Sequence, residues 1–257
     1  MAKMWTKADV FCEVAVLRQK CGITCLPVDA VKLAKEACPN LTIEILNFKT
    51  PLIGGILYRG ENTTRIALNS LHKKQQQNAC CAHELMHYFW HNDGDMVRMC
   101  STTVNTNNFV EWQANEGASE LLMPYRDFIP AFVQELLAPE NYNQKLDFCY
   151  IPSKLGDKYK VTPTMAEFRI NDLLYGTIQY LKGTNIEDIS IISRTQQLRG
   201  GVNYRDFNAM ANHFEEIKKL FMGEINPSSG QSCIAQSVDA AFSGRFKKES
   251  PKGRELT

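Results

Sequence analysis

The first 70 residues pass from helical to strand-like spacing of apolar positions. Apolar side chains recur at helical spacing across residues 6–19, behind Thr6, whose hydroxyl can cap a helix. A second helix fits residues 27–38. The pattern then becomes that of a sheet, with strands predicted at residues 41–46, 53–58 and 64–69. The segment RGEN at 59–62 supplies a hairpin turn between the last two strands, so we expect a small three-stranded sheet.

The remainder of the chain is mainly helical in pattern. Helices are predicted at residues 71–91, 109–122, 126–137, 152–182 and 205–223. The first of them is expected to end near Gly94. Within residues 152–182 the spacing indicates a helix, a turn and a second helix. Thr162 can cap this second helix, and Pro163 suits its first position.

Composition describes an ordinary globular protein without a strong net charge. Of the 257 residues, 44% are hydrophobic and 22% are charged, and the formal net charge is +1. Bulk electrostatics therefore favour neither nucleic acid nor a membrane surface. The N-terminus lacks the apolar run of a signal peptide, and no segment approaches the roughly 18 apolar residues of a membrane span. Because the nine cysteines are odd in number and scattered, we expect a cytoplasmic protein with reduced thiols.

Candidate chemistry is concentrated in the segment CAHELMHYFWH, residues 81–91, which holds three of the five histidines. Residues four apart lie on the same face of a helix, so His83 and His87 can point at one ion, with Glu84 beside them. This is the H-E-x-x-H arrangement, in which two imidazoles bind zinc and the glutamate is the general base for the attacking water. The alternative is an amphipathic helix whose histidines are surface or core residues.

Two features favour a metal site over incidental histidines. The motif is surrounded by apolar residues, so both histidines are expected to be partly buried, and buried histidines need partners. In addition, a predicted pair of strands precedes the motif. These strands could present the backbone of a substrate beside the site by edge pairing.

His91 and Asp93 are the weaker candidates for a third ligand. His91 lies eight residues from His83, about 12 Å along the helix axis, whereas zinc–nitrogen bonds are about 2 Å long. We expect His91 to be a structural residue that interacts with carbonyls at the helix end. Asp93 falls where the extended metzincin-type motif has its third ligand, but that motif needs a glycine where this chain has Trp90.

Glu111, in the segment EWQANEGASELLMP, is the stronger candidate. Four residues share its face of the predicted helix: Ala114, Asn115, Ala118 and Leu122. A carboxylate on such a face is costly unless a charged group meets it, and the small residues allow another helix to approach closely. If this helix packs on the histidine helix, Glu111 reaches the metal; the alternative is a first-turn glutamate stabilised by the helix dipole. Glu116 and Glu120 lie on other faces and are predicted to be solvated.

The order and spacing of three segments resemble the ImmA/IrrE family of metallo-endopeptidases. The segments are RIALNSLHKKQQQNACCAHELMHYFWH, EWQANEGASELLMP and KLGDKYKVTPTMAEFRINDLL, and the resemblance covers roughly residues 25–180. It implies a gluzincin-like site with His83, His87 and Glu111 as metal ligands, water in the fourth position, and Glu84 as the catalytic residue. The implied cofactor is one Zn²⁺ ion, with Mn²⁺ as a substitute.

The resemblance also implies how the chain is organised. We expect a mostly helical α+β fold, in which residues 1–137 form a zincin-like metallopeptidase domain with a short three-stranded sheet and the H-E-x-x-H helix. Residues 138–183 are expected to form a helix-turn-helix-like segment packed on this domain. Residues 184–257 lie beyond the resemblance, and their own pattern predicts a C-terminal helical extension with a disordered tail.

Members of this family occur in bacteria, phages and mobile elements, and several cleave a helix-turn-helix repressor. We therefore expect a zinc endopeptidase that cuts such a repressor and derepresses genes of a phage, a mobile element or a stress response. Two other classes stay open: a non-catalytic regulatory protein on a protease-like fold, and a toxin or defence effector. The chain departs from the family at Met86, where glycine is common, and in the glutamine-rich KKQQQN, where an arginine often precedes the motif. These departures bear on substrate and regulation, but they remove no ligand.

Three further features have plainer interpretations. The cysteines of CGITC and the Cys80-Cys81 pair suggest metal or redox sites, but their spacing suits zinc poorly, so buried thiols are expected. The helix-turn-helix at 152–174 has mixed charges and no basic stripe, so direct nucleic-acid binding is not expected. Tyr88 and Tyr125 could each donate a hydrogen bond to a tetrahedral intermediate, or they could pack in the core.

Overall fold

The computed structural model describes residues 5–61, 63–91, 97–101, 109–136, 138 and 150–202. Its helices are α1 (Lys7–Lys20), α2 (Ala30–Ala37), α3 (Lys74–Trp90), α4 (Phe109–Leu122), α5 (Tyr125–Leu136), α6 (Ile151–Tyr159), α7 (Pro163–Leu181), the short η3 (Ile186–Asp188) and α8 (Arg194–Arg199). Its strands are β1 (Leu41–Leu46), β2 (Ile53–Arg59), β3 (Thr64–Asn69) and β4 (Val97–Ser101). The predicted helix at 205–223, the tail, Asp93 and Gly94 lie outside the described residues. Within those ranges, no helix is both long enough and apolar enough to cross a membrane.

The strands form one four-stranded sheet in the order β1-β3-β2-β4. β1 runs parallel to β3, whereas β2 is antiparallel to both of its neighbours, β3 and β4. Three strands lie at their predicted positions, and the mostly helical α+β fold is confirmed. The periodicity does not predict β4, because this strand has only five residues and depends on the distant β2 for its hydrogen bonds.

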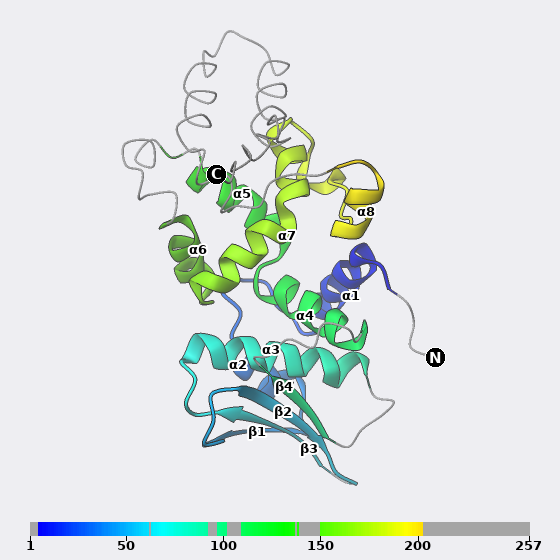
Figure 1. Ribbon diagram of the computed structural model, residues 1–257. Helices are drawn as coiled ribbons and strands as arrows, with labels where there is room; N and C mark the ends of the chain where they lie inside the picture. The colour runs from blue at the N-terminus through cyan, green and yellow to red at the C-terminus, as the bar shows by residue number, and fades with distance from the viewer. Residues whose placement is uncertain are drawn as a thin grey trace, which may run out of the picture.

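Helix α3 lies across one face of the sheet and is itself covered by other helices (Figure 1). It contacts β2 and β3 on one side and α4 on the other, and α1 packs against α4. Helices α5, α6 and α7 contact one another and form a further group beyond α4 (Figure 1). The helix that carries the histidine motif is therefore enclosed between the sheet and α4.

Two consecutive glycines allow α3 to approach the sheet closely. The pairing of β2 with β4 is irregular between Ile53 and Gly55. At this point a Cβ on Gly54 would overlap Sγ of Cys80, and a Cβ on Gly55 would lie 3.5 Å from the Cβ of Cys80. Both glycines therefore present bare backbone to α3, and the helix packs directly against it.

Local side-chain caps begin the first and the longest helix, as predicted. The Thr6 hydroxyl accepts a hydrogen bond from the N–H of Asp9, whose carboxylate accepts one from the N–H of Thr6. At the start of α7, the Thr162 hydroxyl accepts a hydrogen bond from the N–H of Met165, and Pro163 is the first helical residue. Both helix starts thus follow from short sequence motifs alone.

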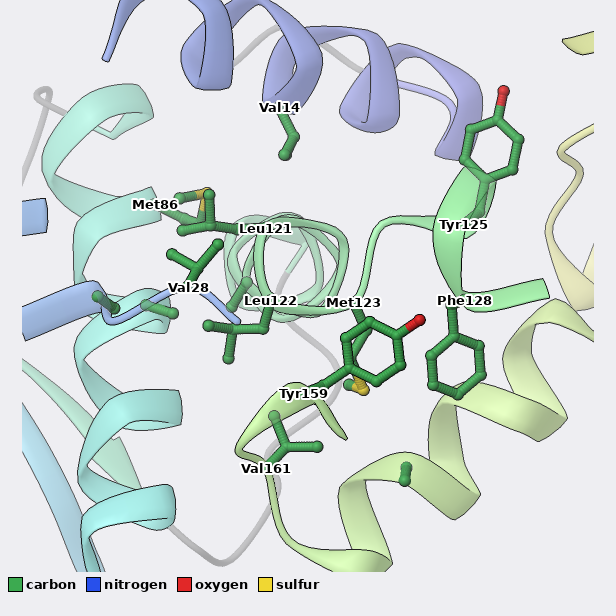
Figure 2. Packing of buried hydrophobic residues seen from close by; sticks show 14 of the residues in the cluster. Val14, Val28, Met86, Leu121, Leu122, Met123, Tyr125, Phe128, Tyr159 and Val161 are labelled. Carbon is green, nitrogen blue, oxygen red and sulfur yellow. The ribbon is translucent and has the colours of Figure 1, made fainter. Parts of the chain in front are cut away.

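The hydrophobic core surrounds the C-terminal half of α4 (Figure 2). Leu121 and Leu122 of α4 are fully buried, as are Val14 of α1, Met86 of α3 and Phe128 of α5. Complete burial of one such side chain stabilises the folded state by about 1.5–3 kcal/mol. The core therefore holds α4 in a defined position against three other helices, including the one that carries the histidine motif.

Glu116 and Glu120 are not solvated, so the prediction from their positions on the helix is wrong. Glu120 is 5% exposed and forms an ion pair with the buried Arg169 of α7. Glu116 lies 3.7 Å from Nζ of Lys7 in α1. Burial raises the pKa of Glu120 to about 7, and the Arg169 guanidinium opposes this rise. Helices α1 and α7 cover faces of α4 that are polar in sequence, and they supply basic partners from distant positions.

The thiols follow the predicted pattern only in part. Six cysteines are free thiols: Cys12, Cys21, Cys25, Cys38, Cys80 and Cys81. Cys81 is fully buried, but its neighbour Cys80 is half-buried, and Cys25 of the CGITC segment is exposed. The expectation of buried thiols is therefore correct for Cys81 and wrong for Cys25.

Candidate metal centre

Three side chains from two helices meet where α3 packs on α4. His83 and His87 of α3 and Glu111 of α4 each contribute a ligand atom, and these atoms all lie within 4.8 Å of one another. Nε2 of His83 lies 3.2 Å from Oε2 of Glu111, and Nε2 of His87 lies 3.3 Å from its Oε1. The two Nε2 atoms are 3.0 Å apart. The structure thus brings together the three residues that the sequence analysis names as ligands.

A glycine of α4 sets the spacing between the two helices. A Cβ on Gly117 would overlap the indole ring of Trp90 in α3. Ala114 and Ala118, on the same helix, are also buried. These small residues allow the close approach that brings Glu111 to the histidines.

Burial and close contact determine the charges in this cluster. Burial lowers the pKa of His87 to about 4, although the nearby carboxylate of Glu111 opposes the shift. The contacts of both imidazoles with the carboxylate hold the pKa of Glu111 well below its usual range. At neutral pH His87 is therefore uncharged and Glu111 is ionised, which are the forms that bind a metal ion.

Asn115 supplies a partner for the outer nitrogen of His83. Oδ1 of Asn115 lies 2.9 Å from Nδ1 of His83. An Nδ1–H that donates to this oxygen leaves the lone pair of Nε2 directed toward Glu111 and His87. Because Asn115 lies one turn after Glu111, the same face of α4 supplies a candidate ligand and the support for another.

The ring of His91 contacts the outer nitrogen of His87. The two Nδ1 atoms are 2.9 Å apart, and Nε2 of His91 lies 3.0 Å from Oε1 of Gln113 in α4. His91 is the C-cap residue of α3, as expected of a helix-end residue, but neither ring contact was predicted from the sequence. Its four-residue spacing from His87 is a signal for the first contact. Gln113 comes from another helix and has no local signal.

The chemistry of the donor set fits a divalent cation of the zinc type. Two imidazole nitrogens and one carboxylate are the protein ligands of one class of catalytic zinc site, which keeps a fourth position open. When both imidazoles donate hydrogen bonds outward, two nitrogen lone pairs and two carboxylate oxygens converge. Four acceptor atoms at this separation repel one another, and a cation between them removes that repulsion.

Glu84 is fully buried at the interface between α3 and β2. A Cβ on Gly55 of β2 would lie 3.3 Å from both Cγ and Oε1 of Glu84. The glycine therefore leaves the space in which this carboxylate lies. Glu84 adjoins the candidate ligand His83 in sequence, and its catalytic role stays a prediction.

The two tyrosines considered for stabilising an oxyanion lie in different surroundings. Tyr125 belongs to α5, and its ring stacks on Phe11 of α1 with the centroids 5.7 Å apart. This contact fits the alternative of core packing. Tyr88, one residue after His87, is half-buried and contacts the ring of Phe89. Its role in stabilising an intermediate stays a prediction.

Comparison with known proteins places the centre in a wider context. Residues 37–171 match the IrrE N-terminal-like domain, a peptidase family. No curated protein matches the chain. Among solved structures, a Mycobacterium tuberculosis transcriptional regulator is similar, with 15% sequence identity and a TM-score of 0.41. That match covers 64% of this chain and 46% of the regulator, so this chain spans less than half the length of that structure.

Proposed function

Because the chain belongs to the IrrE N-terminal-like family of peptidases, we propose that it is a zinc-dependent endopeptidase. The observation that carries this proposal is the convergence of His83, His87 and Glu111. A peptidase family explains why two imidazoles and a carboxylate would be brought together, since these groups form a metal site that can serve hydrolysis. The neutral form of His87 and the ionised form of Glu111 are those that such a site needs.

The proposed chemistry assigns a separate task to Glu84. When bound, the metal ion polarises the scissile carbonyl and makes a water molecule more acidic. Glu84 accepts the proton of the attacking water and then transfers it to the leaving nitrogen. Its burial next to β2 excludes competing bulk water from the carboxylate, and the bare backbone at Gly55 gives it room.

We propose that the substrate is a helix-turn-helix transcriptional repressor in the cytoplasm. The support is the resemblance of the three motif segments to a family in which several members cut such repressors. In the part of the sheet that the structure describes, β4 forms an edge and follows α3 in the chain. An extended segment of substrate could pair with such an edge and lie beside the metal centre.

We propose that residues 1–137 form the catalytic unit, with 138–183 packed on it and 184–257 as an extension. The contacts of α7 support the packing of residues 138–183 on the catalytic unit. Arg169 pairs with Glu120 and also donates a hydrogen bond to the carbonyl of Met123. Helix α7 therefore holds the C-terminal end of α4, the helix that carries Glu111.

The test uses the full-length protein with zinc or manganese and the repressor encoded beside its gene. We expect the wild type to cut this repressor at few sites, as judged by electrophoresis and mass spectrometry. Glu84→Gln removes the base and should slow cleavage by about 10²–10⁴-fold, with bound zinc retained. Glu111→Ala should lose the stoichiometric metal. Glu36→Gln, a change at an exposed glutamate of α2, is the control and should cleave normally.

Two outcomes would contradict parts of this proposal. If Glu84→Gln retains full activity in cells, the protein acts by binding its partner and not by hydrolysis. If Glu111→Ala still holds one zinc ion per chain, Glu111 is not the third ligand.

A further inference from the structure

A buried chain of side chains continues outward from His87. Nδ1 of His87 lies 2.9 Å from Nδ1 of His91, and Nε2 of His91 lies 3.0 Å from Oε1 of Gln113. The exposed fractions of these three residues are 1%, 7% and 2%. The contacts join the C-terminal end of α3 to the first turns of α4. The two helices that form the metal centre are therefore also linked by this series of side-chain contacts.

The polarity of these contacts determines which nitrogen of His87 carries its hydrogen. The amide oxygen of Gln113 can only accept, so Nε2 of His91 donates to it. A neutral His91 then has its lone pair on Nδ1 and accepts a hydrogen bond from Nδ1–H of His87. The lone pair of His87 is thereby on Nε2, the atom that lies 3.3 Å from Glu111.

We propose that His91 and Gln113 are positioning residues that hold His87 in the tautomer and orientation required to bind the metal. This inference rests on the proposed function, because it concerns the same centre. It goes beyond the three ligands by giving a task to the third histidine of the motif. Asn115 performs the corresponding task for His83 in a single step, whereas His87 is supported through two residues.

The size of the expected effect follows from other metal sites. Groups that accept a hydrogen bond from a ligating histidine fix its ring and raise its basicity, and their loss typically lowers metal affinity or activity by about 10–100-fold. We expect a loss of this size when the acceptor at position 91 is removed. A residue that merely fills space would show no dependence on whether its replacement can accept a hydrogen bond.

A matched pair of variants separates these cases. His91→Leu removes the acceptor, whereas His91→Asn places an oxygen near the position of Nδ1. Zinc affinity of the full-length proteins, measured by competition with a chromophoric chelator, should fall by about 10–100-fold in His91→Leu. It should recover to within a few-fold of the wild type in His91→Asn. Thermal unfolding of the metal-free proteins shows whether both variants fold.

A second pair of variants tests Gln113, the last residue in the series of contacts that begins at His87. Gln113→Glu keeps an acceptor for Nε2–H of His91, and zinc affinity should stay close to that of the wild type. Gln113→Lys presents a donor, which favours hydrogen on Nδ1 of His91 and so opposes the Nδ1–H of His87. We expect Gln113→Lys to bind zinc at least as weakly as His91→Leu.

Cobalt-substituted protein supplies a readout that packing alone would not change. Nδ1–H protons of cobalt-bound imidazoles give shifted exchangeable signals in NMR spectra, and we expect two for the wild type and for His91→Asn. In His91→Leu the signal of His87 should be lost to exchange with water, while that of His83 remains.

The outcomes distinguish this inference from the proposal on which it rests. Wild-type protein that binds neither zinc nor cobalt would overturn the proposed function, and this inference with it. Wild-type binding combined with equal affinity in His91→Leu would overturn the inference alone. The same holds if a folded His91→Asn is as weak as His91→Leu, since position 91 would then act by packing.

Discussion

Helix α4 carries a glutamate near each end, and the surroundings of the two differ in kind. Glu111, in the first turn, faces the imidazoles of His83 and His87, whereas Glu120, near the last turn, faces the guanidinium of Arg169. The first cluster gathers acceptor atoms that an added cation could balance. The second cluster contains its own counter-charge. The two acidic groups on one helix can therefore be told apart by asking whether their charges balance within the protein.

The direction of the α4 dipole increases the difference between the surroundings of Glu111 and those of Glu120. A negative charge is favourable at the N-terminal end of a helix and unfavourable at the C-terminal end, so Glu111 is well placed and Glu120 is not. At the unfavourable end, Arg169 and Arg18 both donate hydrogen bonds to backbone carbonyls that end α4. The protein thus places basic side chains at one end of α4 and, at the other end, a group of side chains that could hold a cation.

The largest expected effect comes from removing the internal counter-charge. Arg169→Met leaves Glu120 buried without its partner and should lower the free energy of unfolding by about 3–5 kcal/mol. Urea denaturation of the metal-free protein measures this loss. Adding Glu120→Gln should recover much of it, because the unpaired charge is gone. Zinc affinity of the folded Arg169→Met protein should be unchanged; a clear loss would show that the two clusters are coupled.

Acid should destabilise the metal-centre cluster in particular. His87 has a pKa of about 4 in the folded protein and of about 6.5 when unfolded, so the unfolded chain binds more protons between these values. Its contribution to stability is therefore present above pH 6.5 and is lost as the pH falls toward 4, by about 3 kcal/mol. The measurement is the difference in unfolding free energy between the metal-free wild type and His87→Asn across this range.

The difference between the two proteins is needed because other groups titrate in the same pH range and change the unfolding free energy in the opposite direction. Glu120 has a raised pKa, so its contribution is lost as the pH rises and not as it falls. An unchanged difference between the two proteins from pH 6.5 to pH 4 would contradict the assignment of the neutral form to His87.

The smallest expected effect concerns the space beside Glu84. Gly55→Ala adds a methyl group 3.3 Å from the Glu84 side chain and should displace its carboxylate slightly. We expect cleavage to slow by about tenfold, or about 1.4 kcal/mol, with zinc affinity unchanged. The matched control is Gly54→Ala combined with Cys80→Ala, which adds the same methyl group one residue earlier and removes the sulfur that it would meet. Equal losses in both variants would assign the effect to strand packing.

Local sequence signals predict much of the fold. The Thr6 and Thr162 caps and the apolar spacing of α4 each depend on a few adjacent residues, and the structure has these elements where they are predicted. The same holds for the candidate ligands on α3, since the spacing of His83 and His87 is a property of one helix. Glu111 required the additional argument that its helix packs on α3.

Features that depend on distant residues escape such signals. Glu120 is predicted as solvated because no residue near it in sequence indicates a contact with Arg169, which comes from a helix much later in the chain. Gln113 is missed for the same reason, because its partner His91 lies on another helix. Strand β4 needs β2 to complete its hydrogen bonds. In each case the information lies in the packing of elements and not in their formation.

The contact between Gly117 and the ring of Trp90 has a consequence for ion size. Zinc–oxygen bonds are about 2.0–2.2 Å long, whereas those of calcium are about 2.3–2.6 Å. Because this contact sets how closely α4 approaches α3, it would also set the radius of the ion that Glu111 and the two histidines can coordinate together. Metal selectivity would then be controlled in part by two residues that bind no metal, and Gly117 is the position at which to alter it.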